Sequence, residues 1–384
     1  GTDDTATKNT AYGLTALDAI TTGDNNTATG YAALSANTTG ASNVAVGKDA
    51  LKANTTAGSN TAIGLQSLFT NTTGANNTAT GSQALYSNST GSYNAAVGES
   101  ALYTNSTGAN NVAVGRIALY NNTADDNTAV GYAALTANTT GANNVAVGKN
   151  ALLANTTAAN NVALGMDTLS ANTTGTRNLA IMKNALNSSD TEDDNIAIGY
   201  DSMTTNTAGG TGNVALGNYT LDALTSGDYN VAMGHTALGA NSTGGSNVAI
   251  GHEALLTNTT ASNNTGVGFQ SLKLNSTGDS NVAVGWHSLA ANTTGYYNNA
   301  IGRDALLANT EGAHNISLGS DTMKANTTGN SNVAVGGYSL EANTTASNNI
   351  AVGYTALRAN TTGTRNLAIG VNAYNSSDTE NDNI

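Results

Sequence analysis

A seventeen-residue repeat runs through this 384-residue chain and constrains its fold more than any other feature. The consensus is N-x-A-x-G-x-x-A-L-x-x-N-T-T-G-x-x, and residues 43–59 form one copy. An anchor glycine recurs from Gly13 to Gly370 at seventeen-residue steps, apart from one step of 16 and one of 18, and Met182 occupies one anchor position. Because repeats of this kind stack one structural unit upon the next, we expect a solenoid.

A longer and weaker repetition lies on top of the short one. The segment Thr-Arg-Asn-Leu-Ala-Ile at 176–181 returns at 364–369, which is 188 residues later. We therefore expect one continuous solenoid domain over residues 1–384, with duplicated blocks at roughly 1–195 and 196–384. Because the repetition continues to both ends of the sequence, we also expect the chain to be part of a longer polypeptide.

Equivalent positions of the repeats can be compared with one another. The residue four before the anchor is Asn in all 22 copies, and the residue two before it is Ala in all but two. The residue four after the anchor is Leu in all but three copies. We expect these positions to stack as columns, represented in one copy by Asn43, Ala45, Gly47, Leu51 and Asn54.

The strip before each anchor predicts a short β-strand, because β-branched residues alternate there with alanine. Seventeen residues are too few for a helix-pair repeat, and Thr, Asn and Gly are poor helix formers. The chain has no proline, which would remove a hydrogen bond from a stacked strand. We therefore predict an all-β fold, a parallel β-solenoid or β-roll of about 22 seventeen-residue rungs.

The two faces of the predicted strand suggest how the rungs pack. We expect Val44 and Val46 to point inward toward Leu51, which leaves the alanine column on the outside. Because no charge occurs on the alanine face in any copy, we expect a second layer to cover it. This predicts a homotrimer, or less favourably a dimer. In the alternative, alanine lines a narrow single-chain coil while Val and Thr face outward.

Composition excludes several classes of function. The chain has no cysteine, so disulfides, cysteine-based zinc sites and thiol nucleophiles are ruled out. Only 10% of its residues are charged and the net charge is -13, which disfavours nucleic-acid binding. No apolar run is long enough to insert into a membrane as a helix. We expect no enzyme activity, no cofactor and no metal, because no acid–base cluster is visible.

The repeat resembles two groups of surface proteins. Residues 127–141 are similar to the repeat regions of tail-fibre-like proteins from phages and bacteria. Residues 43–50 resemble more distantly the N-x-V-A-I-G-x-x-S head repeat of YadA-type trimeric autotransporter adhesins, whose heads are parallel β-rolls. The resemblance covers essentially the whole chain. It implies a homotrimeric extracellular fibre on a cell surface, in a virion or in a matrix, that serves attachment or assembly.

The position directly after the anchor varies most, and we expect it on the outer surface. An interaction with surface glycans or with other filaments would use its aromatic residues. These are Tyr31, Tyr132, Tyr200, Phe269, Trp286 and Tyr354. The simpler interpretation is that this position lies on the surface, accepts many residue types and binds no partner. The alternative function is a ligand-binding repeat surface for carbohydrate or, less favourably, for ice.

Three further patterns have competing interpretations. His235 and His252 lie one repeat apart, but no third metal ligand is evident. The acidic segment 190–194 could bind calcium, although a solvated loop is the simpler explanation. The N-T-T corner also has the form of a glycosylation site, whereas a hydrogen-bonded turn would explain it equally. Possible glycosylation sites are Asn37, Asn54, Asn71, Asn138 and Asn292.

Overall fold

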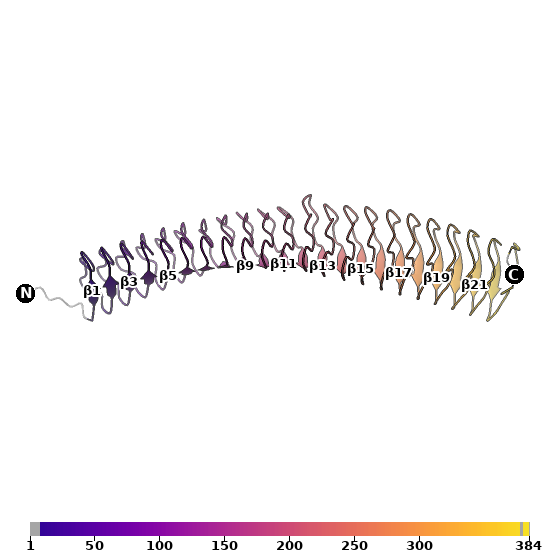
Figure 1. The fold of residues 1–384 in the computed structure, drawn as a ribbon, viewed down its shortest axis with the longest axis horizontal. Coiled ribbons are helices and arrows are strands. Elements are labelled where there is room, and N and C mark those ends of the chain that lie inside the picture. Colours follow the sequence, from indigo (N-terminus) through magenta and orange to yellow (C-terminus); the bar gives the residue numbers. More distant parts are fainter. Residues whose placement is uncertain (1–7, 377–378, 384) are drawn as a thin grey trace, which may run out of the picture. The chain divides into compact units, whose positions relative to one another are not determined.

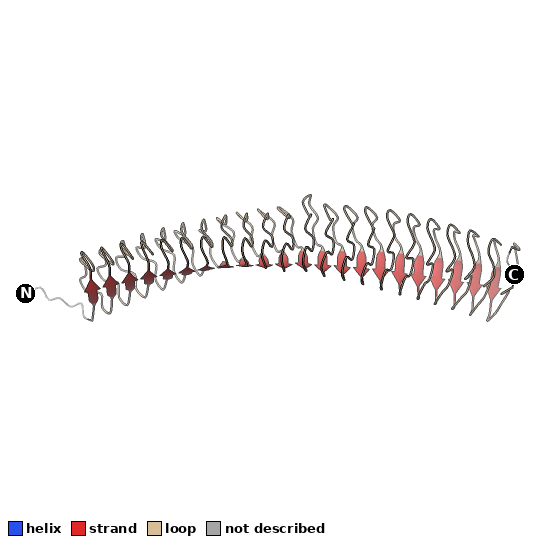
Figure 2. Cartoon of the chain, in the orientation of Figure 1, coloured by secondary structure: helices blue, strands red, loops and turns tan. Residues whose placement is uncertain are grey.

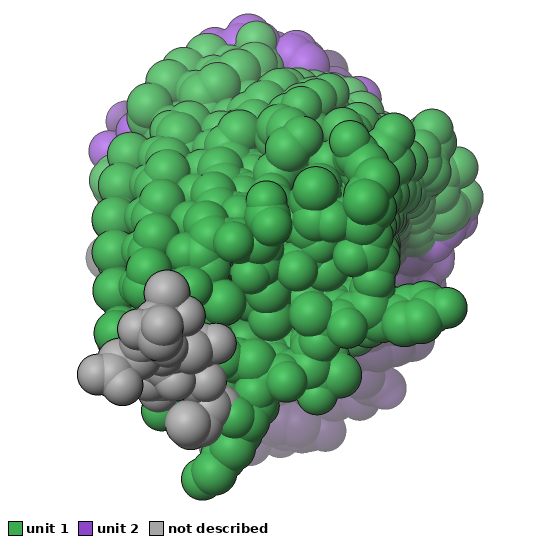
Figure 3. Space-filling model, turned by 90° about the vertical axis from the view of Figure 1, so that its left-hand side faces the viewer, with its two compact units in different colours: residues 1–191 green, residues 192–384 purple. Residues whose placement is uncertain are grey.

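The computed structural model describes residues 8–376 and 379–383. The chain divides into two compact units, residues 1–191 and residues 192–384, which are green and purple in Figure 3. Throughout the described residues the regular elements are strands of three residues joined by turns, with no helix (Figure 2). Accordingly, no helix in this part of the chain could span a membrane.

The first unit is a stack of parallel strands, one for each repeat (Figure 1). Its strands are β1 (Thr10–Tyr12), β2 (Thr27–Thr29), β3 (Val44–Val46), β4 (Thr61–Ile63), β5 (Thr78–Thr80), β6 (Ala95–Val97), β7 (Val112–Val114), β8 (Thr128–Val130), β9 (Val145–Val147), β10 (Val162–Leu164) and β11 (Leu179–Ile181). Successive strands pair in register, so that Ala45 of β3 lies opposite Ala62 of β4.

The second unit repeats this arrangement. Its strands are β12 (Ile196–Ile198), β13 (Val214–Leu216), β14 (Val231–Met233), β15 (Val248–Ile250), β16 (Thr265–Val267), β17 (Val282–Val284), β18 (Asn299–Ile301), β19 (Ile316–Leu318), β20 (Val333–Val335), β21 (Ile350–Val352) and β22 (Leu367–Ile369). Here too equivalent residues are paired, as Ala215 is with Ala232. The predicted parallel β-solenoid with one rung per repeat is therefore confirmed within each unit.

The orientation of the strands corrects the expected packing. Ala45 and Leu51 are fully buried, whereas Val44 is half-buried and Val46 is exposed. Every strand from β2 to β22 has the same pattern, with a buried central residue between two more accessible ones. The prediction that Val faces inward is wrong, and the alternative of a narrow coil lined by alanine is confirmed. The interior holds small Ala and Asn side chains and one Leu per rung, which leaves no room for two valines as well.

Two columns of buried asparagines hold successive rungs together. The side chain of Asn43 is completely buried. Its backbone N–H donates to Oδ1 of Asn26 at 3.0 Å. Its Nδ2 donates to the carbonyl oxygen of Ala57 at 2.9 Å. Asn54 belongs to the second column, and its Nδ2 donates to the same carbonyl at 3.0 Å and to Oδ1 of Asn37 at 2.9 Å. The expected stacking of asparagine amides along the axis is therefore confirmed.

The anchor glycines are required by the approach of the next rung. Gly47 has a φ of 138°, and a Cβ there would lie 2.4 Å from the carbonyl oxygen of Gly64. Only glycine fits both the backbone angle and the contact. Met182 replaces glycine at one anchor, where φ is 86°. The distortion expected at Met182 is thus present as a change in backbone angle.

A strained backbone position recurs at the buried leucine. Leu51 has a φ of 49°, a left-handed angle that is rare for a bulky residue, and Leu34 and Leu68 share it. This angle costs roughly 1–2 kcal/mol. Burial of the leucine side chain contributes roughly 2–3 kcal/mol. The Leu51 N–H also donates to the carbonyl of Ser67 in the next rung at 3.0 Å, so the stack compensates the strain.

Candidate functional site

The outer face of the strands is the most extensive surface that the repeat builds. Each strand places its first and third residues on this face, and none of the 22 strands contains a charged residue. In β7, Val112 and Val114 are 36% and 37% exposed. An uncharged column that mixes Val, Ile, Leu and Thr, formed by the first residues, and a largely apolar column, formed by the third residues, therefore run along each unit. Contiguous exposed apolar surface of this extent marks an interaction site in soluble proteins.

The column after the anchor lies on the outside, where the sequence placed it. Trp286 is 47% exposed and Tyr200 is half-buried. Four further candidate residues are also exposed, namely Tyr31, Tyr132, Phe269 and Tyr354. These side chains are therefore accessible to a partner.

In the second unit the aromatic residues of this column stack upon one another. The rings of His235 and His252 are 5.5 Å apart and within 10° of parallel. His252 stacks on Phe269 at 5.4 Å, and Phe269 on Trp286 at 6.4 Å. The ring faces are therefore covered by neighbouring rings, and their edges point to solvent. A sugar stacked on the faces of Phe269 and Trp286 would have to displace these contacts.

In the first unit, cations of adjacent rungs cover the tyrosines of the column. Lys48 Nζ lies 6.0 Å from the centre of the Tyr31 ring, and the Arg116 guanidinium lies 6.0 Å from that of Tyr132. Arg116 also forms an ion pair with Glu99 at 3.2 Å. These are ordinary stabilising contacts between rungs.

The sequon asparagines are buried in the corner of the coil. All five side chains are completely inaccessible, namely Asn37, Asn54, Asn71, Asn138 and Asn292. In each, Nδ2 donates to the carbonyl three residues ahead, as Asn138 does to Gly141 at 2.8 Å. A glycan on this nitrogen would replace a buried hydrogen bond and would have no space. In this fold the five residues hold the turn.

No metal centre is formed by the described residues. Nowhere among them do three or more His, Asp or Glu side chains converge so as to hold an ion. His235 and His252 stack face to face, as described above. In the acidic segment, Glu192 is buried, and its Oε1 accepts a hydrogen bond from the backbone N–H of Gly209 at 3.0 Å.

A cluster of charged side chains spans three rungs of the second unit. Lys324 Nζ contacts Asp321 at 2.7 Å and Asp304 at 3.1 Å, and Arg303 also pairs with Asp321. Burial alone would raise the pKa of Asp321. Hydrogen bonds from Lys324, Ser320 and Arg303 outweigh burial and hold this pKa below its usual range. His287 lies 3.7 Å from Asp304. The cluster joins rungs and has no nucleophile in an arrangement suited to catalysis.

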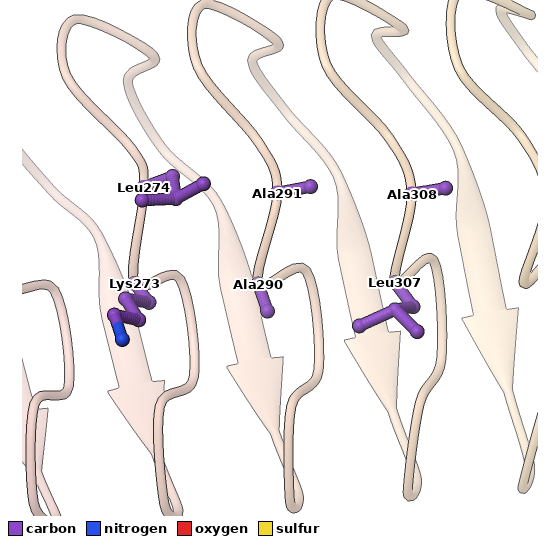
Figure 4. A pocket seen from close by; sticks show the side chains of 6 residues that line it. All are labelled: Lys273, Leu274, Ala290, Ala291, Leu307 and Ala308. Carbon is purple, nitrogen blue, oxygen red and sulfur yellow. The ribbon is translucent and has the colours of Figure 1, made fainter.

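A shallow open groove of about 320 Å³ is present in the second unit. It arises where short alanines lie between longer side chains of adjacent rungs, as Figure 4 shows. Its lining is Lys273, Leu274, Ala290, Ala291, Leu307 and Ala308. Apart from one ammonium group, it offers no polar group that would orient a small ligand.

One aromatic column was missed by the sequence analysis. Phe69, Tyr86, Tyr103 and Tyr120 occur at seventeen-residue steps, five residues after the anchor. Their rings form a parallel stack on the outside of the first unit, with centroids 5.0–5.1 Å apart. Counting aromatic residues in each repeat column would have revealed it.

Comparison with known proteins adds no assignment. No protein-family model matches the chain, and a search of curated proteins found no match. The proposal of a function therefore rests on the surfaces described above. The described residues offer long repeated columns of side chains on a parallel β-solenoid, together with a shallow groove and a charged cluster.

Proposed function

We propose that this chain is a structural protein, the repeat region of an extracellular fibre that serves attachment or matrix assembly. The observation that supports this most is the uniformity of the rungs. The same asparagine, alanine and leucine columns hold nearly every turn, and the residues that vary lie on the outer surface. The resemblance to tail-fibre and adhesin repeats supports an extracellular location on a cell surface, in a virion or in a matrix.

The fibre would assemble from copies of this chain through the outer strand face. Eleven strands about 4.8 Å apart extend for roughly 50 Å, and the two uncharged columns with their side chains are about 10 Å wide. Two such faces in contact would bury roughly 1,000 Å², about the minimum for a stable interface. A second copy is favoured as the partner because it supplies an uncharged face with the same spacing and the same twist.

Two considerations bear on the number of chains in the fibre. The resemblance predicts a homotrimer, but the alanine face on which the sequence argument relied lies inside the coil. Two strand faces can also pack directly against each other as a pair. The mass per length of isolated fibres, measured by electron microscopy, distinguishes three chains from two.

The test of self-association uses sedimentation of the wild-type chain and of substituted variants. Val112→Asp combined with Val147→Asp places charges on the strand face and should yield monomers. Thr56→Asp combined with Thr73→Asp places the same charges on the exposed corner and should leave the oligomer intact. A monomeric wild-type chain, or equal effects of the two pairs, would contradict the proposal.

Ice binding is the second candidate, because the residues of the strand face repeat regularly at the rung spacing. Two strands, β2 and β5, have threonine at both outer positions. If the repeated face binds ice, the wild-type chain should show thermal hysteresis that the strand-face variant loses. Absence of hysteresis in the wild-type chain would remove this candidate.

A further inference from the structure

The stacked tyrosines of the first unit form an arrangement that the proposed fibre function does not use. Tyr86 and Tyr103 have ring centroids 5.0 Å apart with 5° between their planes. Tyr103 and Tyr120 repeat this at 5.0 Å and 2°. All three rings are half-buried on the surface of the coil. Parallel rings related by a simple translation place each ortho carbon about 5 Å from its equivalent in the next ring.

We propose that Tyr86, Tyr103 and Tyr120 form an oxidative cross-linking site, at which a one-electron oxidant converts adjacent tyrosines to dityrosine. Each phenol gives one electron and its hydroxyl proton to the oxidant. The two radicals join through a carbon–carbon bond between ortho carbons. The ortho hydrogens then move to the phenol oxygens, which restores both aromatic rings. The net change is a loss of two electrons and two protons.

The surrounding contacts favour coupling within the stack over coupling between molecules. The backbone beside each ring is bonded to the next rung, as Thr104 N–H is to the Tyr120 carbonyl at 3.0 Å. The hydroxyl of Thr104 reaches the same carbonyl at 2.9 Å. The rings are therefore held next to each other before oxidation. Burial raises the pKa of Tyr103, as do the neighbouring Tyr120 and Tyr86, so its phenol is neutral near pH 7.

The other close tyrosine pairs differ in geometry. Tyr338 and Tyr354 meet at 5.8 Å with 83° between their planes, and Tyr200 and Tyr219 meet at 75°. Edge-to-face rings do not present equivalent ortho carbons to each other. Phe69 stacks on Tyr86 at 5.1 Å but has no hydroxyl, so it ends the reactive part of the column.

The experiment oxidises the full chain with a photogenerated ruthenium(III) tris-bipyridyl complex and persulfate, then digests it with trypsin. Cleavage after Lys52, Arg116 and Lys149 places Tyr103 in peptide 53–116 and Tyr120 in peptide 117–149. A Tyr103–Tyr120 link therefore joins two peptides of known mass. We expect this species to exceed links to the exposed Tyr31 by about tenfold, because proximity raises the effective concentration.

Two variants and an isotope mixture complete the test. Tyr103→Phe preserves the ring stack and should abolish the joined peptides, whereas Phe69→Tyr should add a further coupling partner and increase dityrosine fluorescence. An equal mixture of ¹⁴N- and ¹⁵N-labelled chains should give joined peptides of unmixed isotope. Mixed-isotope products, or a yield no greater than that of Tyr31, would overturn the proposal. Neither result depends on fibre formation.

Discussion

At the scale of single residues, the structure is specified by buried side chains, and most of their polar groups form hydrogen bonds inside the coil. The chain contains natural interruptions of the second asparagine column. One rung beyond Asn206 the column holds Leu224, and Oδ1 of Asn206 is buried without a hydrogen-bond partner. One unpaired oxygen is tolerated in a stack of many rungs. The cost of such a loss can be measured where the column is continuous.

Asn54→Ala should destabilise the first unit by about 3 kcal/mol, because buried partners lose their hydrogen bonds. The variant leaves Oδ1 of Asn37 without its donor and removes one of the two acceptors of Nδ2 of Asn71. Thr56→Ala, two residues along on the exposed corner, should change stability by less than about 0.5 kcal/mol. Denaturant unfolding followed by circular dichroism measures both. Equal midpoints for the two variants would show that the column is not a source of stability.

Gly47→Ala should cost about 3 kcal/mol or more, because alanine would adopt a φ of 138° and contact the next rung. Gly74→Ala is the matched control, because a Cβ there would also lie close to the next rung, 2.2 Å from the carbonyl oxygen of Gly91, whereas its φ is not left-handed. Its column accepts alanine elsewhere, at Ala57, Ala158, Ala261 and Ala346. We expect the control to cost about 1 kcal/mol at most. Similar losses of melting temperature in both variants would refute the distinction between the two glycine columns.

At the scale of the single rung, the sequence predicted the strand but not which of its faces is buried. Alternation separates Val44 and Val46 from Ala45, yet both sets are apolar and uncharged. The choice depends on the volume inside the turn, which holds Leu51 and two asparagines and admits only alanine beside them. The left-handed angle at Leu51 was equally invisible, because leucine gives no local signal for it.

The sequence did place the variable column outside, because hypervariable residues in a fixed repeat are solvent-facing. It missed the stacking of Phe269 on Trp286 and of Tyr86 on Tyr103. Both follow from the rung spacing of about 4.8 Å, once aromatic residues occupy equivalent positions of successive rungs. The sequence thus predicted where the candidate surface lies. It did not predict that the faces of its aromatic rings are covered by neighbouring rings.

The charged cluster on three successive rungs makes the second unit sensitive to acid. Since the pKa of Asp321 is lower in the folded chain than its usual value, its stabilisation is complete above that usual value, about 4. It is lost as the pH falls through the folded pKa. Thermal unfolding should therefore show stability decreasing below about pH 4. In Asp321→Asn this acid-dependent part should shrink, and an unchanged pH profile would contradict the assignment.

At the scale of the whole molecule, stability is expected to be a sum over rungs and their neighbours. Deleting residues 60–76 removes one complete repeat and brings Asn77 into the place of Asn60. The chain should keep its β-sheet circular dichroism and lose only a small part of its stability. Deleting residues 60–68 leaves the remaining rungs out of register and should unfold the neighbouring turns. Equal tolerance of both deletions would argue against a solenoid.

Alanine lies inside the coil, and we propose that copies of the chain cover the outer strand face. Because the chain has no cysteine, single thiols at Val112→Cys, Ala113→Cys and Thr56→Cys report on one surface each. The measurement is the rate of thiol labelling in assembled and in dissociated protein. We predict that Ala113→Cys is protected in both states, Val112→Cys only in the assembly, and Thr56→Cys in neither. Rapid labelling of Ala113→Cys in folded protein, or equal rates for Val112→Cys in both states, would contradict the account.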